Sequence, residues 1–566
     1  MPPVTSDPLG ARRSPWREAL LIGLLALTLN LAGNGRTSLW DRDEPRYAGA
    51  AREMRASGDW INPTFNAEPR YHKPVLIYWL MQAGLAVGGD NAFGARLVSA
   101  LMGVGTVLLT WTWTRRVLGP RAGTLAGLVL ATMPLMVFES KLSTTDATLT
   151  FFFVGCQLAL WELAAKPSLR AALAFWGLLG LAVLTKSPAA PALLVASTGV
   201  GWLLGGPSPL VLLRRLRWRW GLSLFAAIVV PWDVAILVRS GGEYFDVAVG
   251  YHILRRATQG LEEHGGFPGY YVVVGMGTLL PWAALFPAAL AAAWGRRRES
   301  PAAGFLIGWA IGPLIFLECV RTKLIHYYLP AVPALAVLTA WLLDRLLEAP
   351  AEVPARRLLR TARRLIGITT AVEAAGLVAA VALVLPGPMR LPALVLAAVV
   401  AIGGLAAVRE ATAGRWRNAT AVLVGHAAAM GLVLTGWLIP AAEPYRSPSV
   451  VGARMAALEH SVGALSALCT FRPPGVVYAL GHPAPVLRTR DEFVEYADYY
   501  GRLLMPLTPY ELDLLRADPD FDVEVHETVE GLNIEKFRDE ILYLATVAPA
   551  EAPPIVARPD DDSLTR

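Results

Sequence analysis

The sequence predicts an α-helical polytopic membrane protein with a small α/β domain at its C-terminal end. Of its 566 residues, 54% are hydrophobic, and the mean hydropathy is +0.44. Charged residues make up only 17%, whereas a soluble domain has about 25%. Apolar runs of about 20 residues, the length that crosses a bilayer, recur up to about residue 440 and then stop. An ordinary soluble fold is therefore excluded for most of the chain.

We expect about thirteen membrane-spanning helices in a transmembrane domain over residues 1–440. Their centres lie near Leu25, Gly105, Leu130, Phe153, Leu179, Leu194, Ile228, Leu280, Ala310, Leu335, Ala375, Val399 and Leu432. The first apolar run follows three arginines, as in a signal peptide, but no persuasive small-residue cleavage site comes after it. We therefore expect an uncleaved first helix.

The positions of Lys and Arg predict the orientation. Every second connection between the expected spans is basic, as cytoplasmic loops are. Examples are Arg12, Arg13 and Arg17, then Arg115, Arg116 and Arg121, and Arg214, Arg215, Arg217 and Arg219. The N-terminus is then cytoplasmic, and an odd number of spans puts residues 441–566 outside the cytoplasmic (inner) membrane. The net charge of +6 thus indicates topology and contact with anionic membrane lipids, and we expect no nucleic-acid partner.

The alternate connections carry both signs of charge, and the first of them lies within residues 40–90, which we interpret as the catalytic outer loop. Asp43 and Pro45 favour the start of a short helix there, and Gly58 favours its end. The dipole at a helix N-terminus favours the ionised carboxylates of Asp43 and Glu44, as a catalytic base requires. An Asp at this place can equally be a simple helix cap.

Other charged residues reach the same face of the membrane. They are Asp146, Lys186, Lys323 and His326, each at the edge of an apolar run. A carboxylate at the membrane border is costly unless it is paired or functional, whereas Lys186 is as well explained by an interfacial anchor. Because four such groups meet one face, we expect a shared site. A second helix over residues 73–88 is expected to lie along the membrane surface beside it.

Residues 441–566 are expected to form an extracytoplasmic α/β domain. Within it, residues 476–480 (VVYAL) and 523–531 read as strands and residues 492–504 read as a helix. The last residues, 559–566, are expected to be disordered.

Several motifs of the membrane part occur together in one order. They are DEPRYAGAAREM, SGDWINP, YHKPVLIYW, FGARLVSAL, STTDATLTFF, TKSP, LPW and TKLIHYYLPAVPAL. This series resembles the polyprenyl-phosphate-dependent membrane glycosyltransferases of family 39/83 type, which include the protein O-mannosyltransferases and the lipid A aminoarabinose transferases. The resemblance covers roughly residues 41–343, and residues 441–566 are more weakly similar to the smaller domain of the aminoarabinose branch. It implies a C-type glycosyltransferase fold and a donor sugar linked to polyprenyl phosphate.

The resemblance also implies roles for individual residues. The catalytic carboxylates are expected to be Asp43, with Glu44 beside it, and Asp146. The donor phosphate is expected to bind Lys73, Arg255, Arg256, Lys323 and His326. Further substrate contacts are expected from Tyr47, Tyr71, His72, Lys186, His252 and His264. His72 stands where the family often has Glu, which leaves a metal role at this position open.

These roles agree with the chemistry of transfer from a lipid phosphate. A carboxylate removes the proton of the acceptor hydroxyl, and cations stabilise the departing phosphate. A single displacement inverts the sugar carbon. The histidine spacing matches no compact zinc motif, so we expect no metal site and no required cofactor, with a divalent ion as the alternative. No nucleotide-binding glycine motif occurs in strand and helix context, which agrees with a lipid-linked donor.

The expected partners are a polyprenyl-phosphate sugar, membrane lipids, and an acceptor that is a lipid such as lipid A, a protein or another envelope glycan. The alternative function is a transporter or flippase of lipid-linked sugars. Transporters place ionisable groups near mid-membrane on broken helices, often in repeated halves. Here the charges gather at one face and no internal repeat is evident. The sequence therefore favours a transferase.

Overall fold

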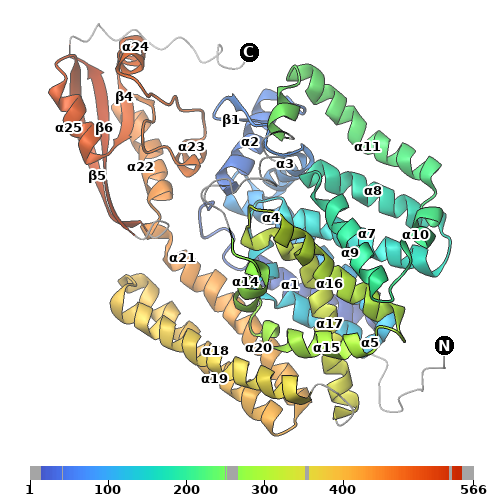
Figure 1. Ribbon diagram of the computed structural model, residues 1–566. Coiled ribbons are helices and arrows are strands. Elements are labelled where there is room, and N and C mark those ends of the chain that lie inside the picture. The colour runs from blue at the N-terminus through green and yellow to red at the C-terminus, as the bar shows by residue number, and fades with distance from the viewer. Residues whose placement is uncertain are drawn as a thin grey trace.

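The computed structural model describes residues 14–40, 43–248, 250, 266–350, 356–533 and 538–550, and most of them are helical (Figure 1). In this described part, nine helical segments are long and apolar enough to cross a membrane. They are α4 (Ala92–Leu118), α7 (Asp146–Ala165), α8 (Leu169–Lys186), α11 (Trp218–Arg239), α16 (Pro301–Cys319), η4 (Ile325–Ala331) continued by α17 (Val332–Glu348), α18 (Arg356–Leu383), α19 (Gly387–Thr412), and α20 (Trp416–Val433) continued to α21 (Ile439–Ala441). The chain is a multi-pass membrane protein.

The other expected spans are shorter or interrupted in the structure. They correspond to α1 (Pro15–Leu31), α5 (Pro120–Ala131) with α6 (Pro134–Glu139), α9 (Ala189–Leu203), and α14 (Tyr270–Thr278) with α15 (Phe286–Gly295). Proline has no N–H to donate and clashes with the preceding turn, which accounts for the breaks before Pro134 and at Pro281. The count of thirteen spans stays a prediction.

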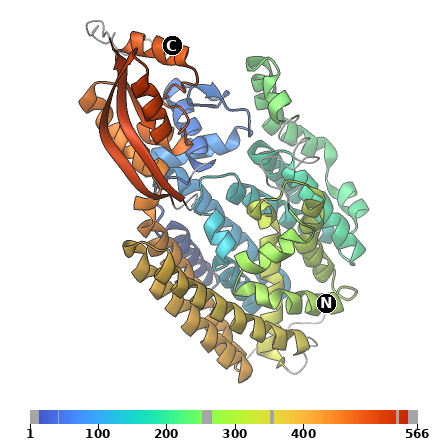
Figure 2. The same cartoon turned by 60° about the vertical axis from the view of Figure 1, so that its left-hand side comes forward.

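Most of these helices form one bundle, and α18 to α20 form a separate layer beside it (Figures 1 and 2). Helix α4 packs against α1, α3, α5 and α7, while α7 packs against α8 and α9 against α16. Short helices α10 (Pro209–Arg215) and α12 (Glu243–Phe245) flank α11. The candidate site lies where α7, α8, α11 and α16 meet the first outer loop.

The first outer loop contains the two predicted helices. Helix α2 (Asp43–Ser57) begins at Asp43 itself and ends before Gly58, whose φ of +70° allows the turn. A small hairpin of β1 (Thr64–Phe65) and β2 (Glu68–Pro69) follows, and then α3 (Leu76–Gly88). Helix α3 lies against α2 and α4 with one face buried, so the apolar residues of that face contact protein. Its position along the membrane surface stays a prediction.

The C-terminal region holds a four-stranded sheet in the order β3-β4-β6-β5. Its strands are β3 (Leu465–Ser466), β4 (Leu503–Leu507), β5 (Phe521–Asn533) and β6 (Arg538–Pro549), and only the β3-β4 pair is parallel. The helices around it are α22 (Ser447–Val462), α23 (Pro474–Leu480), α24 (Arg490–Tyr500) and α25 (Pro509–Ala517). In both views the sheet lies at the end of the molecule that holds α2 (Figures 1 and 2).

One secondary-structure prediction in this region is wrong. Residues 476–480 were expected to form a strand, but they belong to helix α23. Pro474 fits the first turn of a helix and Gly481, at a φ of +83°, ends it. Packing against α22 and α2 then outweighs the strand preference of the two valines. The expected strand at 523–531 is confirmed in β5, and the expected helix at 492–504 is confirmed up to Tyr500 as α24.

Candidate active site

A cavity of about 260 Å³ lies where the first outer loop meets the ends of α7, α8, α11 and α16. Its walls are mostly apolar, with side chains from α8, α9, α12 and α16. Several polar groups converge on it, among them His72, Lys73, Asp146, Lys186, Asp233 and Tyr327. An apolar cavity with a few convergent polar groups is the usual form of a ligand site. The structure thus brings together four predicted residues, His72, Lys73, Asp146 and Lys186.

Asp146 is the first residue of α7, and its carboxylate is buried. Lys186, the last residue of α8, donates a hydrogen bond from Nζ to Asp146 Oδ1 at 2.8 Å. On the other side, His326 Nε2 lies 3.9 Å from Asp146 Oδ2. The Lys186 Nζ atom also lies 4.8 Å from the centre of the Tyr327 ring. Two cationic or ionisable groups therefore surround one buried carboxylate beside the cavity.

Asp43 and Glu44 are neighbours in α2 with different surroundings. Successive helical residues point about 100° apart, and here Asp43 is exposed while Glu44 is buried. Asp43 does not line the 260 Å³ cavity, but its charge acts on nearby groups of the site. Burial and then the Asp43 carboxylate raise the pKa of Tyr47 well above its ordinary value. A carboxylate accessible to an acceptor is what a catalytic base requires.

Both oxygens of Glu44 are held by hydrogen bonds. Oε1 accepts from Arg96 Nε at 2.9 Å and from the N–H and hydroxyl of Ser143 at 2.6 and 3.0 Å. Oε2 accepts from Arg96 Nη2 and the Trp40 N–H, each at 2.7 Å. Arg96 also donates to three carbonyl oxygens of residues 34–38. Glu44 was predicted beside Asp43 as a catalytic carboxylate; in this geometry it instead ties α2 to α4 and to the start of the loop.

Lys323, predicted to bind the donor phosphate, does not line the cavity. Its Nζ donates to the carbonyl oxygens of Leu317 and Glu318 at 3.3 and 3.0 Å, and to the Glu318 carboxylate at 3.0 Å. A lysine at the C-terminal end of a helix satisfies carbonyls that have no helical partner. In this structure Lys323 caps α16, because it follows that helix by only four positions.

The other predicted substrate contacts divide into two groups. Tyr71 packs edge-on against Tyr244 with ring centres 5.9 Å apart, and Tyr47 is buried beneath the Arg70 guanidinium, which lies 5.0 Å from its ring centre. His252, His264, Arg255 and Arg256 lie outside the described residues. Their predicted roles have no structural account.

Three comparisons relate this geometry to known proteins. Residues 72–234 match the family model described as dolichyl-phosphate-mannose-protein mannosyltransferase. An undecaprenyl phosphate-alpha-4-amino-4-deoxy-L-arabinose arabinosyl transferase of Pseudomonas aeruginosa (strain UCBPP-PA14) is 33% identical over 344 residues, covering 58% of this chain and 59% of the relative. A transferase of the same name from Edwardsiella ictaluri (strain 93-146) is 32% identical over 320 residues, covering 54% and 56%.

The crystal structure of ArnT from Cupriavidus metallidurans bound to undecaprenyl phosphate superposes with a TM-score of 0.73 at 23% identity. The match covers 94% of this chain and 98% of that one, so the fold is shared over nearly the whole length. The chain is thus similar in fold to this transferase over nearly its whole length, and residues 72–234 are similar in sequence to the mannosyltransferase family. In sequence it spans about three fifths of the length of the curated relatives, 59% for the first.

Three groups of the site were not predicted from the sequence. Tyr327 and Asp233 line the cavity, and Glu139 is buried close enough to Asp146 for the two carboxyls to interact. Tyr327 follows His326 in the HYY motif, so the same motif that indicated His326 also indicates Tyr327 as a site residue. Asp233 has a signal of its own, since it is the one acidic residue in the apolar helix α11.

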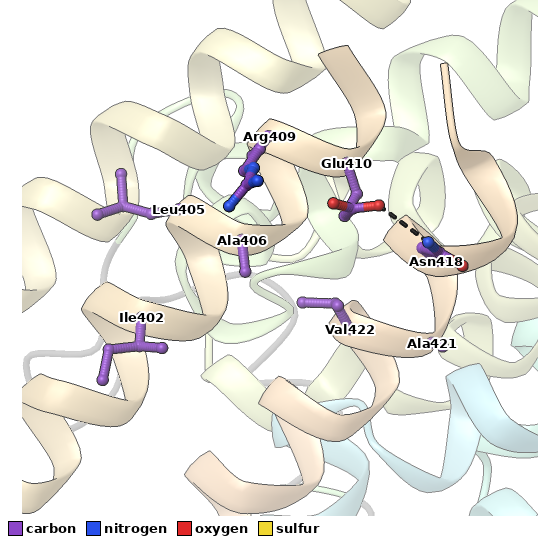
Figure 3. Close-up of a pocket in the computed structure, with 8 residues that line it drawn as sticks. All are labelled: Ile402, Leu405, Ala406, Arg409, Glu410, Asn418, Ala421 and Val422. Atoms are coloured by element: carbon purple, nitrogen blue, oxygen red, sulfur yellow. Dashed lines mark hydrogen bonds between the residues drawn. The ribbon is translucent and has the colours of Figure 1, made fainter. Parts of the chain in front are cut away.

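The described residues contain no group of three or more His, Cys, Asp or Glu side chains arranged to hold a metal ion. A second hollow lies between α19 and α20, lined by eight residues around Glu410 and Asn418 (Figure 3). Asn418 donates to Glu410 at 3.0 Å, and Arg415 pairs with the same carboxylate at 2.6 Å. Asn418 and Arg415 thus satisfy the one carboxylate of this hollow, and its other lining residues apart from Arg409 are apolar, so it lacks the features of a reaction site.

Proposed function

We propose that this protein transfers a sugar from a polyprenyl phosphate carrier to an acceptor hydroxyl or phosphate at the outer face of the cytoplasmic membrane. The single observation that carries the proposal is the apolar cavity in which Lys73, Lys186 and the buried Asp146 meet. An apolar wall suits an isoprenoid chain, and two lysines suit its phosphate. The names of the relatives, which specify an undecaprenyl-phosphate-linked aminoarabinose, support a donor of this class.

The proposed reaction is one displacement at the anomeric carbon. The acceptor oxygen forms a bond to that carbon while the bond to the phosphate oxygen breaks, and the configuration inverts. Asp43 takes the proton of an acceptor hydroxyl, and the phosphate leaves with the carrier. Lys73 and Lys186 stabilise the charge on the departing phosphate, and Asp146 orients Lys186 through their hydrogen bond. This step requires no cofactor, and Arg255 and Arg256 stay as further phosphate ligands suggested by the resemblance.

The proposed topology has a cytoplasmic N-terminus and an extracytoplasmic domain over residues 441–566. Basic connections on one face and mixed charge on the other support it. The acceptor is then a lipid such as lipid A, a protein or another envelope glycan, which the reaction would meet outside the membrane.

The test is transfer of labelled sugar from a polyprenyl-phosphate donor to lipid A by purified protein in lipid vesicles. Asp43→Asn is expected to lower the rate by about 10²- to 10⁴-fold, the usual contribution of a general base. Asp498→Asn, which changes an exposed acid of α24, is the matched control and should transfer at the wild-type rate. Equal rates for Asp43→Asn and wild type would remove Asp43 from the mechanism, and the absence of wild-type transfer would remove the proposed function.

A further inference from the structure

Asp233 stands out in the wall of the cavity because it is a carboxylate inside an apolar helix. It lies six residues before Arg239, the last residue of α11, which is about 9 Å along the helix axis. Asp233 is partly buried and lines the same cavity as Lys73 and Lys186. Carboxylates at such positions are expensive and are usually retained for function.

Within the described part of the chain, Asp233 has no counter-ion. Among the described residues it makes no hydrogen bond or ion pair, and no charged side chain there acts on it. The other buried acid of the cavity, Asp146, is neutralised by Lys186. As far as the described residues show, the cavity therefore has lysines on one part of its wall and one carboxylate without a counter-ion on another.

Contacts with the first outer loop fix the direction of this carboxylate. The indole Nε1 of Trp232, the residue before Asp233, donates to the carbonyl oxygen of Ile61 at 3.0 Å. Arg239 Nη2 forms an ion pair with Asp59 at 2.7 Å. Because these two contacts hold α11 against the loop at two points, rotation of the helix is opposed and Asp233 stays on the cavity side.

A ligand that complements this cavity carries an anionic group and, at a distance, a cationic one. A sugar joined to a lipid phosphate supplies the anion at its anomeric end. A protonated amino group on the far side of the ring would supply the cation and would form a charge-assisted hydrogen bond with the carboxylate. A hydroxyl or an acetylated amine at that position would leave the Asp233 charge unpaired in an apolar wall, which is unfavourable.

We propose that Asp233 is a specificity-determining residue that selects a donor sugar bearing a protonated amine. The assignment rests on the proposed function, since it concerns the donor of the same site. It adds a residue and a physical cause for donor choice: the amine is preferred because it is the one common sugar substituent that neutralises the carboxylate.

The test is equilibrium binding of three lipids to purified protein in nanodiscs. The lipids are polyprenyl phosphate carrying a 4-amino-4-deoxy pentose, the same lipid with its amine acetylated, and the carrier phosphate alone. Asp233→Asn is expected to weaken binding of the amino donor by about 10- to 100-fold, the range of one charge-assisted hydrogen bond. Binding of the other two lipids should change by less than about 3-fold. Glu243→Gln, which alters an exposed acid of the adjoining helix α12, is the matched control and should leave all three unchanged.

The outcomes separate the two proposals. If Asp233→Asn weakens the binding of all three lipids equally, Asp233 is a structural residue and the assignment is overturned. Equal affinity of the wild type for the amino and acetylated donors would also overturn it. If Asp233→Asn does not fold, the wild-type preference is followed to a pH at which the sugar amine is neutral; the preference must disappear there, and its persistence overturns the assignment. Selective binding without any transfer would reject the proposed function and leave the recognition by Asp233 standing.

Discussion

Lys186 Nζ lies 2.8 Å from Asp146 Oδ1, which joins the last residue of α8 to the first residue of α7. Both side chains are largely buried, with 15% and 7% of their surface exposed. A buried pair gains little over an apolar pair of the same shape, but removing one partner leaves an unpaired charge. The pair therefore has a positional role in the cavity as well as an electrostatic one.

Lys186→Met is expected to lower the transfer rate by about 10²- to 10³-fold, as the loss of one group that stabilises the transition state does. It should also lower stability by about 3 kcal/mol because Asp146 loses its partner. The matched control is Lys166→Met, since Lys166 pairs with Glu162 while both are largely exposed, and such a pair contributes less than about 1 kcal/mol. Activity and thermal unfolding in detergent measure both effects. Equal unfolding temperatures for the two variants would show that the Asp146 pair is not structurally important.

The Glu44–Arg96 pair predicts a particular response to acid. Burial acts to raise the pKa of Glu44, but the Arg96 charge and the hydrogen bonds from Arg96, Ser143 and Trp40 outweigh it, so the pKa lies below its ordinary value of 4.5. A folded-state pKa below the unfolded one stabilises the protein above pH 4.5, and this stabilisation is lost as the pH falls through the folded value. Glu44→Gln removes the effect at every pH.

The unfolding temperature of wild type should therefore exceed that of Glu44→Gln at pH 6, and the difference should shrink as the pH is lowered toward 3. Glu495→Gln, which changes an exposed acid, serves as the control and should follow wild type throughout. A difference that stays constant down to pH 3 would show that the ionised form of Glu44 is not what stabilises the loop.

The sequence predicted the parts of the site that depend on local rules. Helix α2 follows from Asp43, Pro45 and Gly58, and the meeting of Lys73, Asp146 and Lys186 follows from the charge rule, which puts their connections on one face. The charge rule also puts Lys323 on this face, but its amine donates to the carbonyl oxygens at the end of α16. Only the three-dimensional contacts decide between helix capping and ligand binding. The strand predicted over residues 476–480 was wrong for a similar reason, since packing on α22 and α2 outweighs the local strand preference. Asp233 was missed because one acid in an apolar run belongs to no motif.

Arg446 links the C-terminal region to the loop that carries Asp43. It is 1% exposed, and its guanidinium donates to the carbonyl oxygens of Ser38 and Leu39 at 3.1 and 2.8 Å. It also lies 4.4 Å from the centre of the Trp40 ring. Arg446→Met should leave the Leu39 carbonyl without this donor and the Ser38 carbonyl with Arg96 alone, which costs about 1–3 kcal/mol. It should also lower the transfer rate about 10-fold because Asp43 follows this segment within three residues.

Its matched control is Arg454→Met, which removes a half-exposed pair with Glu527 in the same region and should lower stability by less than about 1 kcal/mol. Circular dichroism checks that the sheet persists in both variants. Wild-type activity in Arg446→Met would show that the C-terminal region does not position the loop.

Trp232 offers the mildest change beside the cavity, since it packs edge-on against the lining residue Tyr244. Trp232→Phe keeps an aromatic ring but loses the hydrogen bond to Ile61, a net loss of about 1 kcal/mol. Since that bond holds α11 against the loop, we expect KM for the lipid-linked donor to rise several-fold while secondary structure is unchanged. Trp218→Phe is the control within the same helix, because its Nε1 donates to the Leu213 carbonyl at 2.7 Å at the opposite end of α11. If both variants raise KM equally, the effect comes from the stability of α11 in general, and the contact between Trp232 and the loop does not shape the donor site.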